Sequence, residues 1–322
     1  MKSGDETLDL SMGHPEFLAP FWTARPDTRL YPERGDAFRY CTDGLDTLKN
    51  SIRNIHKVYG NASCENHFVV IGGGATQLIP ATVYALRLKG YDSVTAPIPY
   101  FPGFRNSAQL LGLHWAGKGD GAGVIEFITY PNNPDGRFID PSFSKSFKIY
   151  DLSYYWPHYT KIEAFEGDVM IFSLAKVTGH AACRIGWALV KDPEMAAAMH
   201  RYVLLNSMGI SLESQTVASQ ILNMTADDPK KSCITFACKK LEDRRAQLAN
   251  ALKKHPEFEL LSEWGLYAWI RGKGNLSNEF LKRFGVLGRP GQVFGVGDEY
   301  FRLSMGASNA IFETLLKRLE NG

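Results

Sequence analysis

The sequence predicts an α/β protein, with a large domain built on a three-layer, mostly parallel sheet and a smaller α+β domain. Between about residues 67 and 190, short apolar runs alternate with longer helical patterns, a rhythm that is typical of βαβ units. After Asp192-Pro193 the pattern is helical to about residue 255 and then gives way to short strand-like pieces. The central sheet should therefore be built from the first two thirds of the chain.

The expected elements follow in chain order. The strands expected in the large domain are the apolar runs at 67–71, 93–97, 124–129, 147–151, 169–173 and 185–190. Between the first two strands, residues 75–90 predict a helix that ends at Gly90. In the small domain, strand-like alternation appears at 265–272 and 299–305.

We expect the large domain at residues 25–205, and a small domain that combines residues 1–24 with 206–322. The chain has no internal repeat, no low-complexity tract and no long polar linker, so the two domains should pack closely. A cleft between them is the natural place for an active site.

Composition narrows the class of protein. The 322 residues are 44% hydrophobic and 22% charged, which is ordinary for a globular protein. A net charge of +2 without a dense basic run argues for small-molecule partners and against nucleic acid or membrane. Five scattered cysteines without a CxxC pair favour a reducing compartment and predict no metal site. Because the sequence shows neither a signal-like apolar core nor a run near the roughly 20 apolar residues that span a bilayer, we expect a cytoplasmic protein.

Two glycine- or proline-rich loops follow expected strands, where ligands bind in open parallel sheets. Gly72–Gln77 opens a helix and would present backbone N–H groups to a phosphate, although such a turn is as often purely structural and lacks the ending of a nucleotide-binding P-loop. The loop at 130–136, YPNNPDG, taken alone predicts a tight turn.

Two further segments carry stronger chemical signals. Asp151 ends an expected strand, and Tyr154 follows it among aromatic residues that would exclude water. A buried carboxylate needs a cationic partner, which a protonated pyridine nitrogen would supply. The alternative is that Asp151 caps a helix. A second segment places Ser173, Lys176 and Arg184 around a glycine turn. The serine hydroxyl and the arginine guanidinium are suited to bind a phosphate, and the lysine amine is suited to react with an aldehyde. Most lysines are solvated charges, but one flanked by apolar residues is costly unless it is paired or covalently committed.

Taken in order, these motifs resemble a known signature. Asn-Pro-x-Gly, Asp-x-x-Tyr and Ser-x-x-Lys with Arg eight residues later resemble fold-type I aminotransferases, which use pyridoxal 5′-phosphate (PLP). The segments NNPDG, DLSYYWPHYT, AKVTGH, RIGWALVKD and HKVYGNA resemble the alliinase and tryptophan-aminotransferase-related family. The similarity covers nearly the whole chain and implies the aminotransferase fold of type I.

The resemblance implies roles for the matching residues. Lys176 would hold PLP as an internal Schiff base and then move the substrate Cα proton. Asp151 would pair with the pyridinium nitrogen, while Asn133 and Tyr154 would hydrogen-bond the ring 3-oxygen. Phe101 would stack on the ring. The phosphate would be held by Gly74, Ala75, Thr76, Ser173 and Arg184.

The resemblance also implies a homodimer, because Tyr31 corresponds to a tyrosine that reaches the phosphate of the neighbouring subunit. Arg302 would grip the substrate α-carboxylate with its planar fork, and Gly13 would close over the same group through its backbone. His14, beside Gly13 at the substrate, stands where the family has an aspartate.

Other positions also depart from the family pattern. Ala75 lacks a serine hydroxyl in the phosphate loop, Ala182 and Cys183 replace glycine and serine, and Tyr150 replaces histidine. These departures leave the substrate and the reaction open. The leading hypothesis is transamination of an L-amino acid, with aromatic amino acids as first candidates, to a 2-oxo acid. The alternatives are β-elimination by a C–S lyase, a PLP decarboxylase or similar specialised PLP enzyme, and a non-catalytic protein on the same fold.

Overall fold

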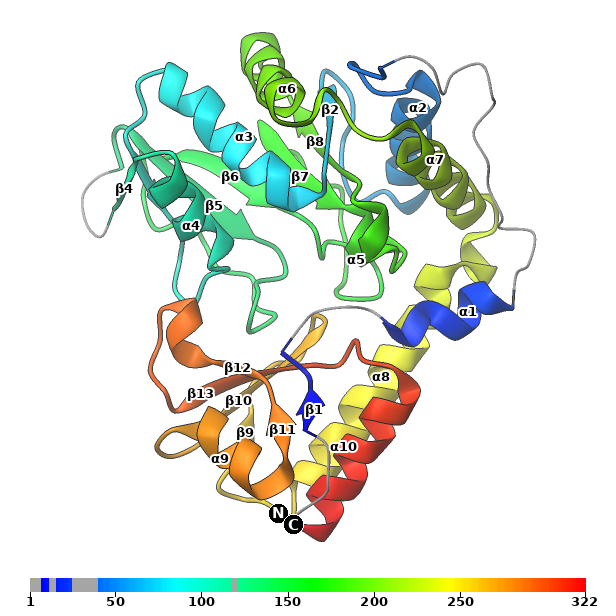
Figure 1. The fold of residues 1–322 in the computed structure, drawn as a ribbon, viewed down its shortest axis with the longest axis vertical. Coiled ribbons are helices and arrows are strands. Elements are labelled where there is room, and N and C mark those ends of the chain that lie inside the picture. Colours follow the sequence, from blue (N-terminus) through cyan, green and yellow to red (C-terminus); the bar gives the residue numbers. More distant parts are fainter. Residues whose placement is uncertain (1–6, 12–15, 25–39, 117–120) are drawn as a thin grey trace.

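The structure is a computed structural model, and it describes residues 7–11, 16–24, 40–116 and 121–322. A seven-stranded sheet forms the centre of the larger lobe (Figure 1). Its strands in chain order are β2 (Phe68–Gly72), β3 (Ser93–Thr95), β4 (His114–Trp115), β5 (Val124–Thr129), β6 (Phe147–Asp151), β7 (Val169–Ser173) and β8 (Gly186–Val190).

The strand order is β2-β8-β7-β6-β5-β3-β4. All neighbouring pairs are parallel except those made by β8, which runs antiparallel to both β2 and β7. The predicted mostly parallel sheet is therefore confirmed. The expected strands at 124–129, 147–151 and 169–173 coincide with β5, β6 and β7, whereas the two-residue edge strand β4 was not predicted.

Helices cover the sheet on both sides. Those of the larger lobe are α2 (Asp46–Tyr59), α3 (Ala75–Leu88), α4 (Gly103–Leu110), α5 (Leu174–Val177), α6 (Pro193–Ser207) and α7 (Leu212–Asp227). Helix α3 packs against α4 and α6, and α2 packs against α7 (Figure 1). The predicted helix at 75–90 is α3, and Gly90 follows it with a φ of +92°.

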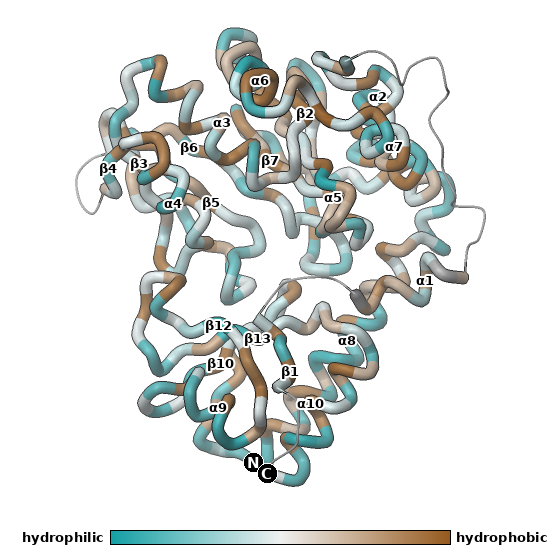
Figure 2. Tube along the Cα trace, in the orientation of Figure 1, coloured by the Kyte–Doolittle hydropathy of each residue, from teal (hydrophilic) through white to brown (hydrophobic). Residues whose placement is uncertain are grey.

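Strand β7 is apolar from Val169 to Phe172 because both faces of the sheet are covered there. In β7, Val169 and Ile171 belong to the core cluster that contains the residues of α3 and α6, whereas Met170 and Phe172 belong to the cluster that contains those of α2. This alternation follows from the two-residue period of a strand. Figure 2 shows β2 and β7 as hydrophobic stretches of the chain.

The smaller lobe is built mainly from the C-terminal part of the chain. Its elements are α8 (Cys233–Leu252), β9 (Glu259–Leu260), β10 (Tyr267–Arg271), α9 (Leu276–Phe284), β11 (Val286–Leu287), β12 (Arg289–Pro290), β13 (Tyr300–Ser304) and α10 (Asn309–Asn321). The antiparallel sheet has the order β12-β13-β10-β9, and the predicted strands at 265–272 and 299–305 contain β10 and β13.

The N-terminal segment lies with this lobe. Strand β1 (Leu8–Asp9) pairs in parallel with β11, and α1 (Ala19–Thr23) lies against α8. Short 3-10 turns complete the described elements: η1 (Glu16–Leu18), η4 (Ala181–Cys183), η5 (Pro229–Lys231) and η6 (Gly291–Phe294). The predicted boundary after residue 205 stays a prediction, and the packing of α7 against α2 places that helix beside the large sheet.

Arg244 on α8 anchors the smaller lobe from inside. Its side chain is 2% exposed, and its Nη1 donates to the carbonyls of Met305 and Ala307, 2.6 Å away in each case. The guanidinium also lies over the ring of Phe312, 4.6 Å from its centroid. A buried cation is stable only with such partners, so this one joins α8 to the turn between β13 and α10.

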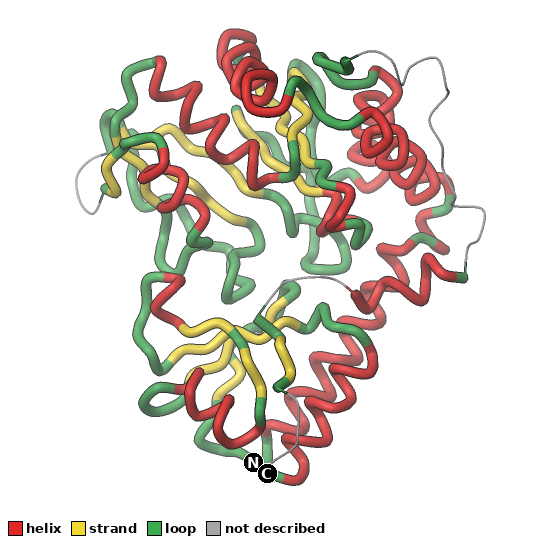
Figure 3. Tube along the Cα trace, viewed as in Figure 1, coloured by secondary structure: helices red, strands yellow, loops and turns green. Residues whose placement is uncertain are grey.

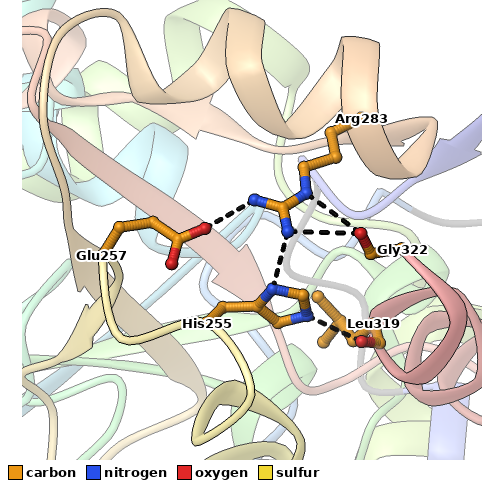
Figure 4. A network of polar contacts seen from close by, with 5 residues as sticks. All are labelled: His255, Glu257, Arg283, Leu319 and Gly322. Atoms are coloured by element: carbon orange, nitrogen blue, oxygen red, sulfur yellow. Dashed lines mark hydrogen bonds and ion pairs between the residues drawn. The ribbon is translucent and has the colours of Figure 1, made fainter.

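A second polar network ties the end of α10 to α9 (Figure 4). Arg283 donates to Glu257 and to the main-chain oxygen of Gly322, and its Nη2 lies 3.0 Å from Nδ1 of His255. His255 in turn bonds the carbonyl of Leu319 at 2.7 Å. The network fixes the outer end of the lobe, away from the loops that carry the candidate site.

Those loops lie between the lobes. Strands β5, β6 and β7 are parallel, so their carboxyl ends share one edge of the sheet, and Figure 3 shows the connecting loops gathered there, facing the smaller lobe. Polar residues placed at these strand ends therefore face the smaller lobe. Within the described ranges, no helix is both long and apolar enough to cross a membrane.

Candidate active site

A cavity of about 980 Å³ opens where the strand ends of the large sheet meet the smaller lobe. It brings together most of the residues predicted from the sequence: Ala75, Thr76, Phe101, Asn133, Asp151, Tyr154, Ser173, Lys176, Arg184 and Arg302. Gly74 lies directly behind this lining, against Arg184. The predicted residues Gly13, His14 and Tyr31 lie outside the described residues.

Lys176 sits on α5, a single helical turn that begins as β7 ends at Ser173. Because this helix stops at Val177, the Lys176 carbonyl has no helical partner ahead of it, and two side chains bond it instead. Nε2 of His158 donates at 3.0 Å, and the Tyr159 hydroxyl donates at 2.9 Å. The backbone that carries the lysine is therefore held from the loop that follows β6.

The Lys176 side chain is deep in the lobe, with part of its surface open to the cavity. Burial lowers the pKa of its amine below the usual value, and the charges of Arg302 and Arg184 act in the same direction. A lowered pKa raises the fraction of neutral amine, which is the nucleophilic form. Burial also lowers the pKa of His158 to about 4, so this ring is neutral when it bonds the Lys176 carbonyl.

Asp151 is the last residue of β6 and is 5% exposed. Its Oδ1 accepts hydrogen bonds from the Ser153 amide at 3.1 Å and from the Ser153 hydroxyl at 2.6 Å. Burial raises the pKa of this carboxyl, which the bonds from Ser153 and the Lys176 charge oppose. A cation in the cavity would favour the ionised form, as expected for a carboxylate that pairs with a ring nitrogen.

The anion cradle is formed where α3 begins beside Arg184. Gly74 has a φ of +77°, and a Cβ built there would lie 2.7 Å from an Arg184 nitrogen, so only glycine suits this position. Gly186 on β8 is equally constrained, because its Cβ would lie 2.6 Å from the Gly74 backbone. Together these contacts place a guanidinium beside the N-terminus of α3, an arrangement that binds phosphate.

Two tyrosines face each other across the cavity floor. The hydroxyls of Tyr154 and Tyr267 are 2.8 Å apart, and both residues are buried. Burial tends to raise the pKa of Tyr267, but the charges of Arg302 and Lys176 outweigh it and lower that pKa, whereas burial raises the pKa of Tyr154. The two hydroxyls share one hydrogen bond in which either can donate, so one of the two protons stays available for a ligand oxygen.

Arg302 on β13 reaches from the smaller lobe into the same cavity. Its Nη1 donates to Oδ1 of Asn133 at 2.7 Å, and its Nη2 donates to the Ser11 carbonyl at 3.0 Å. The guanidinium lies over Tyr267, 3.8 Å from the ring centroid. Its Nε is buried and has no hydrogen-bond partner among the described residues. A buried donor of this kind indicates an acceptor that a ligand would supply.

These features fit PLP. The cavity offers a partly neutral amine, a carboxylate, an anion cradle and a tyrosine proton, one for each polar part of the cofactor. Phe101 lines the same cavity and offers an aromatic face to a ring bound there.

Sequence reasoning missed several residues of the site. Tyr267 and Arg289 line the cavity from the smaller lobe, and His158 and Tyr159 hold the lysine backbone. Tyr267 lies in a predicted strand, β10, which pairs with β13. In this register Tyr267 is opposite Ser304, and Ser304 points to the same face of the sheet as Arg302, two residues away. Pairing the two predicted strands in this register is the signal that would have found it.

Comparisons with known proteins agree with this site. The alliinase C-terminal family model, described as allinase, matches residues 8–322. Tryptophan aminotransferase-related protein 4 of Arabidopsis thaliana is 31% identical and covers 98% of this chain and 78% of its own length. Alliin lyase 1 of Allium sativum is 29% identical and covers 85% of this chain and 65% of its own length.

Solved aminotransferases share the fold. An aminotransferase from Escherichia coli superposes with a TM-score of 0.78 at 18% identity, covering 99% of this chain and 91% of its own. Tyrosine aminotransferase from Leishmania infantum gives a TM-score of 0.74 at 16% identity, covering 98% and 91%. The predicted family and fold are confirmed, and alliinases and fold-type I aminotransferases use the predicted cofactor, PLP.

The raised pKa of Asp151 makes the stability of the cofactor-free protein depend on pH. A carboxyl whose pKa is raised by folding stabilises the folded protein most at pH values below its pKa in the unfolded chain, about 3.9. That stabilisation is lost as the pH rises through the pKa of the carboxyl in the folded protein. Asp151→Asn keeps an oxygen for Ser153 and removes the charge. We expect the cofactor-free variant to unfold at higher urea than the cofactor-free wild type at about pH 8, and at nearly the same urea at about pH 4.

The same variant should bind PLP more weakly and lose most activity, because a neutral amide cannot balance a pyridinium. Asp168→Asn, at an exposed carboxylate, is the matched control and should follow the wild type at both pH values. A difference between Asp151→Asn and wild type that does not change with pH would contradict the burial of an ionisable carboxyl.

Proposed function

This chain belongs to the alliinase family, and we propose that it is a PLP-dependent aminotransferase that transfers the amino group of an L-amino acid to a 2-oxo acid, with aromatic amino acids as the first candidate donors. The observation that supports this most is the placing of Lys176 and Arg302 in one cavity. The first is an amine that can carry a proton, and the second is a buried guanidinium suited to a carboxylate. Amino acids and 2-oxo acids both carry that carboxylate beside the reacting carbon.

PLP, when bound, supplies an aldehyde carbon for amines and a ring that withdraws electrons from the substrate Cα. Lys176 would take the Cα proton and return it one position away, a task for which its lowered pKa suits it. Asp151 would hold a negative charge against the ring nitrogen, and Tyr154 would donate its proton to the ring oxygen. Arg184 and the N-terminus of α3 would hold the phosphate.

Arg302 would orient the substrate. Its Nη atoms already bond Asn133 and Ser11, and these contacts fix the plane of the guanidinium, so a carboxylate that docks on it meets a preorganised donor.

The second candidate is β-elimination from a cysteine derivative, which is supported by the similarity to alliin lyases. Both reactions begin with removal of the Cα proton, so the residues around Lys176 serve either. They differ in whether an acceptor is needed.

The deciding experiment measures products with and without an acceptor. We expect a 2-oxo acid to form from an aromatic amino acid continuously only when a second 2-oxo acid is present, and an S-substituted cysteine to yield little pyruvate in its absence. Lys176→Ala should abolish both reactions, and borohydride reduction of wild type should attach the pyridoxyl group at Lys176. Sustained pyruvate release from the cysteine derivative without acceptor would replace the aminotransferase proposal with the lyase.

Arg302 provides a second test. Arg302→Lys replaces a two-pronged contact with a point charge, and Arg302→Ala removes it. Since charge-assisted hydrogen bonds contribute about 1.5–3 kcal/mol each, we expect Arg302→Ala to lower kcat/KM for an amino acid by about 10²–10⁴-fold, and for the amine that lacks the carboxylate by much less. PLP content should stay near that of wild type. An equal loss for both substrates would mean that Arg302 acts structurally.

We also propose a homodimer in which Tyr31 reaches the phosphate of the partner site. A mixing experiment tests it: Lys176→Ala and Tyr31→Phe each damage every site in their own dimers, but a hybrid dimer contains one intact site. Random mixing should restore about a quarter of wild-type activity. If hybrid dimers form, as sedimentation and a tagged subunit would show, and activity stays at the sum of the separate variants, the shared site is contradicted.

A further inference from the structure

We propose that Ser153 is a positioning residue for the cofactor: its hydroxyl holds Asp151 in the ionised form and leaves one carboxylate oxygen for the nitrogen of the PLP ring. The inference rests on the use of PLP and goes beyond the proposed reaction, because an aminotransferase and a lyase would need the same carboxylate. It is carried by two hydrogen bonds, by the burial of both residues and by the place of Asp151 in the cavity wall.

Ser153 brings two donors to the same oxygen of Asp151. Its amide nitrogen lies 3.1 Å from Oδ1, and its hydroxyl oxygen lies 2.6 Å from the same atom. An amide N–H can only donate, so Oδ1 is fixed as an acceptor. The second oxygen, Oδ2, has no hydrogen bond to any residue that the structure describes, and Asp151 lines the cavity. Oδ2 is therefore the oxygen that a ligand can meet.

The surroundings of Asp151 make its negative charge costly. Asp151 and Ser153 are each 5% exposed, so water gives the carboxylate little support. On the neighbouring strands, Asp151 lies opposite Thr129 of β5 and Ile171 of β7, and neither side chain carries a charge. Burial raises the pKa of the Asp151 carboxyl, and the Ser153 hydroxyl is the strongest influence in the opposite direction.

The other ionisable groups near Asp151 do not replace this hydroxyl. Lys176 on α5 favours the ionised carboxyl less than the Ser153 hydroxyl does, and burial lowers the pKa of its own amine. Tyr154, in the same loop, stays protonated because burial raises its pKa. The remaining ionisable residues of the described cavity lining make no hydrogen bond to Asp151: His180, Cys183, Arg184, Tyr267, Arg289 and Arg302.

Loss of the hydroxyl should weaken PLP binding in a way that depends on pH. Without it the pKa of Asp151 would rise further, because a charge-assisted hydrogen bond to the ionised form is gone. At pH values above that pKa the carboxyl is ionised with or without cofactor, so PLP binding changes little. At pH values below it the empty site holds a protonated carboxyl, and binding must restore the charge without the help of Ser153. The loss should therefore grow as the pH falls.

PLP affinity measured across pH tests the inference. Cofactor is removed from wild type and Ser153→Ala, and rebinding of PLP is followed by visible absorbance. We expect Ser153→Ala to bind PLP about 10- to 100-fold more weakly than wild type at about pH 6, and nearly as tightly at about pH 9. Ser153→Cys, which keeps the shape of the side chain but is a weaker donor, should lie between the two.

Two controls separate this role from packing. Ser219→Ala removes a similarly buried hydroxyl, which lies 2.8 Å from the Ser51 hydroxyl between α7 and α2, and should follow wild type at every pH. In the Asp151→Asn background, Ser153→Ala should cause no loss that depends on pH, because position 151 no longer carries a charge.

The inference is overturned if Ser153→Ala binds PLP like wild type throughout this pH range, if its loss is equal at both ends of the range, or if the pH-dependent loss persists beside Asp151→Asn. No substrate takes part in these measurements, so their result is independent of the acceptor experiment. Unchanged PLP affinity together with acceptor-dependent turnover would reject the role of Ser153 and leave the proposed function intact.

Discussion

The arrangement of the site depends on holding one lysine at the end of a buried strand. Burial makes its ammonium form costly, and a single-turn helix gives its backbone few bonds of its own. The segment that follows β6 supplies both a countercharge for the amine and hydrogen bonds for the backbone. Asp151 begins that segment and His158 and Tyr159 end it, so the loop that supplies the cavity carboxylate also supplies the two donors on the Lys176 carbonyl. The spacing between carboxylate and amine is thereby fixed within one lobe.

The substrate side of the cavity is fixed from the other lobe. Arg302 and Tyr267 lie on neighbouring strands of the small sheet, and Arg302 bonds Asn133 on the loop after β5. A shift between the lobes would move both residues relative to Lys176. Trp22, from the N-terminal segment, adds a link by donating to the Thr178 carbonyl at 2.9 Å. Reactive and orienting groups thus come from different lobes, and the chemistry requires the lobes to be packed together.

The sequence predicted well what depends on local pattern. Strand β7 is apolar up to Ser173 because both faces of the sheet are buried there, and an apolar run of that kind indicates a strand from the local sequence alone. The contact of Tyr267 with Arg302 depends on the register of two strands separated by a helix and loops. Arg289 was missed for the same reason, since nothing near it in the sequence shows that it lies opposite Arg302. Such pairings are set by tertiary packing and not by local propensity.

The anion cradle tolerates some departures from the family pattern, because it is formed mainly by backbone atoms and Arg184. At position 75 the family serine would offer a hydroxyl, but the start of α3 still presents its backbone, and Arg184 still lies beside it, so Ala75 removes one donor without removing the site. Cys183 lines the cavity, and its thiol donates to the Ser214 carbonyl on α7 at 3.3 Å. Position 74 has no such tolerance, because its φ of +77° strains any residue other than glycine and a Cβ there would also displace the Arg184 guanidinium. An anion site made mainly from backbone and one arginine can lose a side-chain donor, provided that this glycine is kept.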